Sequence, residues 1–209
     1  MKSFNLDLHL VTNRNVSLGR DLLDIVQAAV QGGVSVVQLR EKECATREFV
    51  ELGQAVSSLL QKTSVPLIIN DRVDVALAIG ANGVHIGQSD MPYVDARRLL
   101  GPDAIIGLSV ESEAHALAAE DLDVDYLGLS PVFTTPTKTE LKEQLGLEGV
   151  AKIRRLSRHR LIAIGGINCE NISAILKSGA DGVAVVSAIC SAPDPLMATR
   201  QLQRQIALR

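Results

Sequence analysis

Short apolar runs alternate with stretches of helical periodicity along the whole chain. The apolar runs are rich in Val, Ile and Leu and contain few polar residues, which is typical of parallel strands covered on both faces. Each run predicts one strand, at Leu6–Val11, Ser35–Leu39, Leu67–Ile69, Gly83–Ile86, Ile105–Leu108, Asp125–Leu129, Leu161–Ile164 and Gly182–Val186.

The segments between these runs predict amphipathic helices. Leu22, Ile25 and Ala29, for example, recur at the spacing of a helix with one apolar face. Similar glycine turns, in QGGVSVV, GANGVHI and SGADGVAVV, lead from a helix into the next strand. Eight strand–helix units in succession predict an α/β protein with a single (β/α)8 TIM barrel formed by residues 1–209. An open, doubly wound sheet is the alternative.

The composition narrows the classes of partner. A net charge of −3 and only 2% aromatic residues argue against a nucleic-acid partner. No apolar run approaches the roughly 18 residues of a membrane-spanning helix, and residues 1–13 lack the apolar core of a signal peptide. The three cysteines are scattered, without the paired spacing of a zinc site or a disulfide framework. We therefore expect a cytoplasmic protein that acts on small molecules, without a membrane partner.

Two carboxylates follow neighbouring predicted strands, where TIM barrels place their active sites. Asp71 comes after the third strand and Asp90 after the fourth. Adjacent parallel strands lie about 4.8 Å apart, so both side chains are expected to reach one ion at the same rim. Carboxylates with Asn70 beside them suit Mg²⁺, which completes its coordination with water and substrate phosphate oxygens. An ion pair of Asp71 with Arg72 or Arg40 is the alternative.

Positive charge is expected around the same rim, at Arg40, Lys42 and Lys138. Carboxylates that hold a metal within a ring of cations are suited to a magnesium–diphosphate group. Lys138 lies in a long polar segment, residues 134–146, which predicts a mobile lid over an anionic substrate. An ordinary surface loop is the alternative for this segment.

A second anion site is predicted at the ends of the last two strands. Gly165 and Gly166 allow a phosphate to approach the backbone closely, and Val186 and Ser187 begin a short helical turn. A tight turn without a ligand is the alternative.

Two histidines and a serine are further candidates. His85 alternates with apolar neighbours in its strand, so its side chain is expected inside the barrel, either as a core residue or as a substrate contact. The same two interpretations apply to His9. Ser109 has no histidine and carboxylate in a triad pattern around it, and a hydrogen bond to substrate is favoured over a nucleophilic role.

The chain resembles the thiamine-phosphate synthase family over about residues 10–195. The segments that carry the resemblance are, in order, VQLREK, NDRVDVAL, GVHIGQSD, GLS, SPVFTTPTK, AIGGI and GADGVAVVSAI. The resemblance implies a TIM barrel and a transferase of thiamine biosynthesis. In this reaction a pyrimidine diphosphate loses diphosphate through a pyrimidine carbocation, and the nitrogen of a thiazole phosphate takes its place.

The resemblance also implies roles for individual residues. Mg²⁺ would be bound by Asp71 and Asp90. The diphosphate would be held by Arg40, Lys42, Asn70 and Lys138. The pyrimidine would be bordered by Gln38, His85 and Ser109. The thiazole phosphate would be bound by Thr135, Thr137, Gly166, Val186 and Ser187. The residues implied to act in catalysis are Arg40, Lys42, Ser109 and Lys138.

The chain departs from the family pattern at three positions. Glu111 stands where many members have histidine, Ser130 where glycine is common, and Pro136 where an acidic residue is common. The first departure argues against the related thiazole tautomerase, which relies on a histidine at that place. A third possibility, a non-catalytic phosphate-binding barrel, would not need Asp71, Asp90 and Lys138 together. The sequence allows a homodimer and leaves the oligomeric state open.

Overall fold

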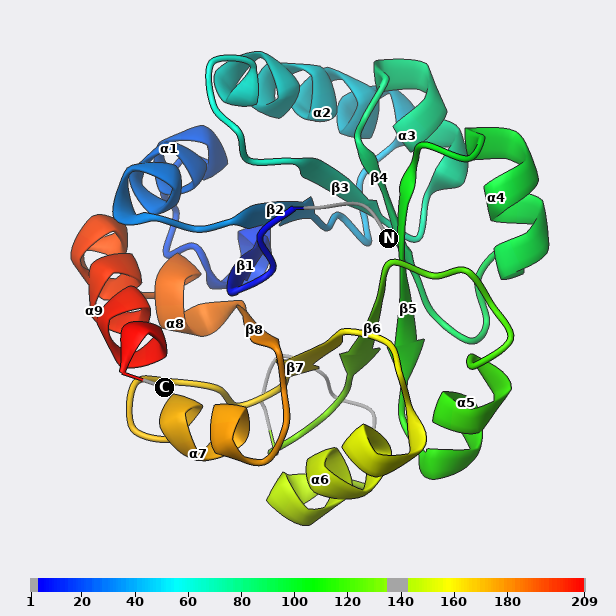
Figure 1. The fold of residues 1–209 in the computed structure, drawn as a ribbon. Helices are drawn as coiled ribbons and strands as arrows, with labels where there is room; N and C mark the ends of the chain where they lie inside the picture. Colours follow the sequence, from blue (N-terminus) through cyan, green and yellow to red (C-terminus); the bar gives the residue numbers. More distant parts are fainter. Residues whose placement is uncertain (1–3, 135–142, 209) are drawn as a thin grey trace.

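The computed structural model describes residues 4–134 and 143–208, which form a closed ring of parallel strands surrounded by helices (Figure 1). The strands are β1 (Leu8–Val11), β2 (Val36–Leu39), β3 (Leu67–Asn70), β4 (Gly83–Ile86), β5 (Ile105–Val110), β6 (Tyr126–Leu129), β7 (Leu161–Ile164) and β8 (Gly182–Val185). They pair in sequence order, and β1 closes the barrel against β8 with His9 opposite Ala184. The predicted (β/α)8 barrel is confirmed, and the open doubly wound sheet is not formed.

Helices cover the outside of the barrel, and each strand is followed by at least one of them. They are α1 (Leu22–Gly32), α2 (Thr46–Leu60), α3 (Val73–Ile79), α4 (Tyr93–Leu100), α5 (Glu113–Ala118), α6 (Gly146–Leu156), α7 (Ile172–Lys177), α8 (Ser187–Cys190) and α9 (Pro195–Ala207). A short 3-10 turn, η1 (Arg14–Val16), precedes α1. In the described part of the chain, no helix combines the length and the apolar character needed to cross a membrane.

The caps of α1 illustrate why these helices begin and end where they do. Asp21 accepts a hydrogen bond from the backbone N–H of Leu23 at 2.8 Å, which satisfies a free donor of the first turn. The helix ends at Gly33, whose φ of 106° lies in a region that glycine adopts without strain.

Polar residues placed just before the strands close the end of the barrel where the strands begin. Each accepts a hydrogen bond from the backbone N–H that begins a neighbouring strand. The donor and acceptor pairs are Leu8 to Ser35 at 3.0 Å, Leu67 to Asn82 at 2.8 Å, Ile106 to Asp125 at 2.8 Å and Leu161 to Asp181 at 2.8 Å. This recurring contact explains why similar turns lead into several strands.

The strands divide their side chains between two apolar layers, because successive residues point to opposite faces. On β4, Val84 and Ile86 pack toward the helices, whereas His85 points into the barrel. The inner layer of eight apolar residues consists of Leu6, Val11, Val36, Ile68, Ile105, Tyr126, Ile162 and Ala184. Polar side chains join this layer toward the carboxyl ends of the strands, where the inside of the barrel becomes a cavity.

Candidate active site

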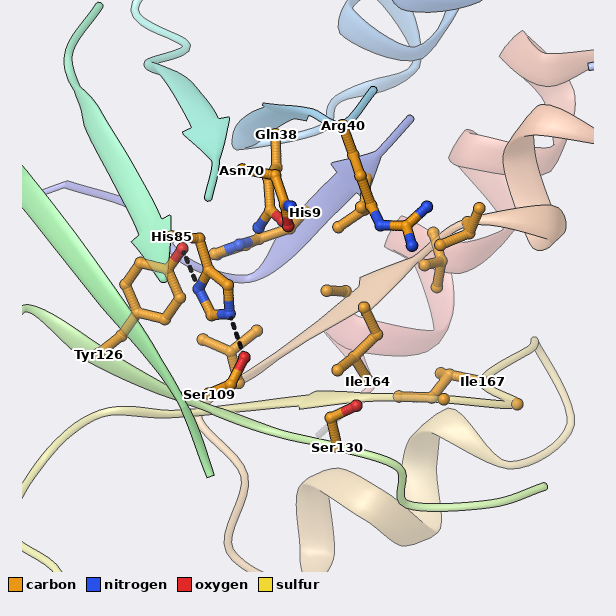
Figure 2. Close-up of a pocket in the computed structure, with 18 of the residues that line it drawn as sticks. His9, Gln38, Arg40, Asn70, His85, Ser109, Tyr126, Ser130, Ile164 and Ile167 are labelled. Carbon is orange, nitrogen blue, oxygen red and sulfur yellow. Dashed lines mark hydrogen bonds between the residues drawn. The ribbon is translucent and has the colours of Figure 1, made fainter. Parts of the chain in front are cut away.

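A cavity opens at the carboxyl ends of the strands, and every strand contributes to its wall (Figure 2). Most of the predicted site residues that the structure describes line it. They are Gln38, Arg40, Asn70, His85, Ser109, Gly166, Val186 and Ser187. The sequence analysis missed other residues of the wall. These are Val11, Tyr126, Gly128, Ile162, Ile164, Ile167, Ala184 and Val185, and Ser130 was noted only as a departure from the family pattern. Gly165 and His9, which the sequence analysis also considered, line the cavity too.

Hydrogen bonds link the side chains of His85, Tyr126 and Ser109 across the cavity. His85 Nδ1 lies 3.1 Å from the Tyr126 hydroxyl, and His85 Nε2 lies 2.9 Å from Ser109 Oγ. Full burial raises the pKa of Tyr126 well above its ordinary value, so its hydroxyl stays protonated. The His85 and Tyr126 rings also stack, with centroids 5.5 Å apart. This network orients the Ser109 hydroxyl beside the space where a substrate would lie.

Two strand glycines make room for this network. A side chain at Gly107 would place its Cβ 2.1 Å from Tyr126 Cζ, and one at Gly128 would lie 2.7 Å from His85 Cε1. No real Cβ tolerates such distances. Glycine inside a strand often marks a place where another group approaches the backbone closely. Gly107 and Gly128 could therefore have indicated from the sequence that large side chains, here Tyr126 and His85, pack against them.

Asp71 and Asp90 follow β3 and β4 and lie close enough to interact, although neither they nor Lys42 are among the residues that line the cavity. Asp90 Oδ2 accepts a hydrogen bond from the Gly87 N–H at 2.6 Å. Burial raises the pKa of Asp90, and the neighbouring Asp71 carboxylate raises it further, while Lys42 opposes the shift. Asp71 adopts a φ of 63°, which is uncommon for a residue other than glycine. Two adjacent carboxylates held in this way favour a cation between them.

The alternative ion pairs of Asp71 are not formed. Its carboxylate pairs with Lys42 Nζ. Arg72 contacts a different carboxylate, that of Asp74, with Nη2 2.6 Å from Oδ2. Because Lys42 and Asp71 are both partly exposed, this pair contributes little to stability.

Arg40 extends its guanidinium over the mouth of the cavity (Figure 2). Its backbone N–H donates to Thr12 Oγ1 at 2.9 Å, which fixes the residue at the end of β2. Within residues 4–134 and 143–208, the guanidinium has no hydrogen bond or ion pair. An arginine in the cavity wall with no partner among the described residues is suited to binding an anion, since its fork of donors matches phosphate oxygens.

The predicted second anion site also lies at the cavity wall. Gly165 and Gly166, in the loop after β7, have φ of 109° and 64°. A Cβ on Gly166 would lie 2.8 Å from the Thr134 carbonyl oxygen, so only glycine fits there. Val186 immediately precedes α8, which begins at Ser187. A short helical turn was predicted at these two residues. The structure brings both loops to one side of the cavity.

The remaining predictions for this site concern residues 135–142. Thr135, Thr137, Lys138 and Pro136 lie outside the described residues, as does most of the predicted lid, 134–146. Ser130, the departure that precedes Pro131, is buried and lines the cavity.

His9 lies fully buried in the cavity wall, and this position has a consequence for stability. Burial lowers the pKa of His9 to about 3 from its ordinary 6.5, with smaller contributions from His85 and Arg160. The unfolded chain therefore binds one proton more than the folded chain between these pH values. The free energy of unfolding should fall as the pH drops below 6.5, by up to about 1.4 kcal/mol per pH unit.

Denaturant unfolding of the wild type and of His9→Phe at pH 7 and pH 5 measures this contribution. Relative to the variant, the wild type should lose roughly 2 kcal/mol over that interval, because phenylalanine has no proton to bind. Between pH 7.5 and 8.5 the difference between the two proteins should stay constant, which serves as the control. Equal losses in both proteins at pH 5 would show that His9 titrates normally.

Comparisons with known proteins agree with the geometry. Residues 8–189 match the family model described as thiamine monophosphate synthase. A thiamine-phosphate synthase of Albidiferax ferrireducens is 53% identical over 201 residues, covering 96% of this chain and 92% of that relative. One from Syntrophomonas wolfei is 49% identical, covering 98% of both chains. The solved thiamine phosphate pyrophosphorylase from Pyrococcus furiosus superposes with a TM-score of 0.89 at 38% identity, covering 97% of this chain and 96% of that one.

Proposed function

We propose that this chain, which belongs to the thiamine monophosphate synthase family, joins 4-amino-2-methyl-5-hydroxymethylpyrimidine diphosphate to 4-methyl-5-(β-hydroxyethyl)thiazole phosphate. The products are thiamine phosphate and diphosphate. One observation carries the assignment of substrates to this site. Arg40, whose guanidinium has no partner among the described residues, lies in the wall of a cavity lined by apolar and hydrogen-bonding side chains, and the interacting carboxylates of Asp71 and Asp90 follow two neighbouring strands of the same barrel.

The residues at the rim fit Mg²⁺. Asp71 and Asp90 supply oxygen ligands and repel each other without a cation, which is the cause of part of the raised pKa of Asp90. Among the described residues, no group of three or more His, Cys, Asp or Glu side chains could hold a metal ion by itself. Mg²⁺ commonly takes few protein ligands and completes its coordination with water and phosphate. When bound, it would neutralise charge on the leaving diphosphate.

The protein's own side chains would do the rest by positioning and charge. Arg40 and Lys42 would hold diphosphate oxygens while the bond to the pyrimidine methylene carbon breaks and its electron pair leaves with oxygen. The thiazole nitrogen then supplies the electron pair for the new bond to carbon, so no general base is required. Ser109, oriented by His85, would hold the pyrimidine in line with the thiazole, which makes the encounter effectively intramolecular.

The loops after β7 and β8 would bind the second substrate. Gly166, Val186 and Ser187 offer backbone N–H groups at the cavity wall, the usual phosphate-binding place in this fold. Thr135, Thr137 and Lys138 would complete the two phosphate sites from the lid. With both phosphates anchored at opposite sides of the cavity, the two rings would meet between them.

Three further assignments accompany this function. The whole chain acts as one catalytic domain, because every strand contributes to the cavity wall. The enzyme works in the cytoplasm, which fits its three free cysteines, since thiols stay reduced in that compartment. A homodimer stays a prediction. The thiazole tautomerase and the non-catalytic phosphate-binding barrel are less well supported, since neither needs the pair of adjacent carboxylates.

A two-substrate assay tests the proposal. The purified protein, incubated with both substrates and Mg²⁺, should yield thiamine phosphate and diphosphate in equal amounts by mass spectrometry and phosphate analysis. Removing Mg²⁺ with a chelator should slow turnover, and re-adding it should restore the rate. The pyrimidine alcohol, which lacks the diphosphate, serves as the control and should not react. Protein that is folded by circular dichroism and forms no product would contradict the proposal.

A further inference from the structure

His9 lies in the wall of the barrel cavity, and neither of its ring nitrogens has a hydrogen-bond partner within the described part of the chain. Its side chain is 0% exposed. Burying a polar atom without a partner costs free energy, and native proteins rarely leave such atoms unpaired. An unpaired polar ring that lines a ligand cavity therefore indicates a contact that the ligand completes.

His85 differs from His9 in this respect. The Tyr126 hydroxyl and Ser109 Oγ already engage both His85 ring nitrogens, at 3.1 and 2.9 Å. His85 thus holds its neighbours in place, and its hydrogen-bonding atoms face protein groups. The edge of the Tyr126 ring meets His9, with ring centroids 5.3 Å apart and planes at 80°, so that the His9 ring is fixed as well. Figure 2 shows the His9 ring close to Asn70 and His85.

We propose that His9 accepts a hydrogen bond from the exocyclic amino group of the pyrimidine substrate and thereby helps to select the ring that enters the barrel. This inference rests on the proposed function. Of the two substrate rings, only the pyrimidine carries an N–H donor, since the thiazole has none. The diphosphate of the same substrate would be held by Arg40 and Lys42, with Asp71 and Asp90 holding its metal ion, which leaves the aromatic ring in the deeper part of the cavity.

The protonation state of His9 fits the role of acceptor. A neutral imidazole has one nitrogen with a lone pair and one with a hydrogen. Burial lowers the pKa of His9 to about 3, so the ring is neutral at physiological pH and keeps its lone pair. When the diphosphate leaves, positive charge spreads over the pyrimidine ring and makes its amino group a stronger donor. The hydrogen bond would then stabilise the transition state more than the bound substrate.

The assignment is tested by comparing two proteins, wild type and His9→Phe, with two substrates, the pyrimidine diphosphate and its analogue without the 4-amino group. His9→Phe keeps an aromatic ring but removes both nitrogens. It should lower kcat/KM for the pyrimidine diphosphate about tenfold or more and leave the KM for the thiazole phosphate within about twofold. With the analogue that lacks the 4-amino group, wild type and variant should differ by less than about threefold, because the contact is already missing. The variant should be at least as stable as the wild type at pH 7, because it buries no unpaired polar atom.

Two conservative variants provide the matched control. His9→Asn places an amide near the position of Nδ1, and His9→Gln places one near Nε2. One of them should restore part of the discrimination between the amino substrate and its analogue, and would identify the nitrogen that faces the substrate. If His9→Phe lost the same factor with both substrates, the assignment would be overturned in favour of a packing role.

A binding measurement separates this inference from the proposed function. Nitrogen-15 NMR of the histidine rings, with the His9 signals identified by their loss in His9→Phe, should show a shift when the pyrimidine alcohol saturates the wild-type protein. Unmoved signals at saturation would overturn the assignment. Wild type that forms no thiamine phosphate would contradict the proposed function. Wild type that forms it while His9→Phe matches its kcat/KM would overturn the His9 assignment alone.

Discussion

Replacing Asp90 by asparagine should lower kcat roughly 10²- to 10³-fold while the barrel stays folded. The change removes one of two negative charges at the rim and keeps the shape of the side chain. The carbonyl oxygen of asparagine can still accept the hydrogen bond that Asp90 Oδ2 receives from Gly87 at 2.6 Å. Since Asp71 and Asp90 repel each other, loss of one charge should not lower the free energy of unfolding.

The measurement is the dependence of the rate on Mg²⁺ concentration. The Asp90→Asn variant should require a higher concentration for half-maximal rate and should not recover the wild-type kcat at saturation. Asp74→Asn is the matched control, because Asp74 is an exposed carboxylate that pairs with Arg72 and not with Asp71 or Asp90. It should behave as the wild type. A wild-type rate for Asp90→Asn would remove Asp90 from the metal site.

Replacing Arg40 by glutamine should lower kcat/KM for the pyrimidine diphosphate roughly 10- to 100-fold, the cost of losing charge-assisted hydrogen bonds to phosphate. The guanidinium has no partner among the described residues, so its loss should leave the melting temperature unchanged. Because Arg40 would act on the leaving diphosphate, the KM for the thiazole phosphate should change little. Arg40→Lys should restore only part of the loss, since an ammonium cannot bind two phosphate oxygens in one plane.

Steady-state kinetics with each substrate varied in turn checks the Arg40 prediction. Arg98→Gln is the control, because Arg98 pairs with Asp95 on the exposed face of α4 and should be silent in both kinetics and stability. If Arg40→Gln raised the KM for the thiazole phosphate and left kcat/KM for the pyrimidine diphosphate unchanged, the assignment of the two substrates to the two phosphate sites would have to be reversed.

The architecture was predictable because buried parallel strands produce continuous apolar runs and because eight of them occur in succession. The errors lie at both ends of the strands. Ser109 was expected to follow the fifth strand, but β5 continues through it to Val110. Asp125 was assigned to the sixth strand but precedes it, where its carboxylate accepts the Ile106 N–H at 2.8 Å. Ser35 was likewise assigned to the second strand and instead bonds the start of β1. A polar residue that caps a neighbouring strand cannot be distinguished by local sequence from one that begins a strand.

The rim of the site was also predictable, because the ends of adjacent parallel strands must meet. This is why Asp71 and Asp90, which follow β3 and β4, lie close enough to interact. The residues deep in the cavity were harder to predict from the sequence. Tyr126 has the sequence character of an ordinary core residue, and only closure of the barrel turns its hydroxyl toward His85. Whether His9 faces the helices or the cavity depends on a register that pairs it with Ala184, far along the chain.

The central claim is that one divalent cation joins the two rim carboxylates to the diphosphate of the substrate. Crystals grown with diphosphate and Mn²⁺ in place of Mg²⁺ test it directly, since Mn²⁺ can be located by its anomalous scattering. The account predicts one peak in contact with carboxylate oxygens of both Asp71 and Asp90 and with an oxygen of the diphosphate. A diphosphate bound in the cavity with its Mn²⁺ contacting neither aspartate would contradict it.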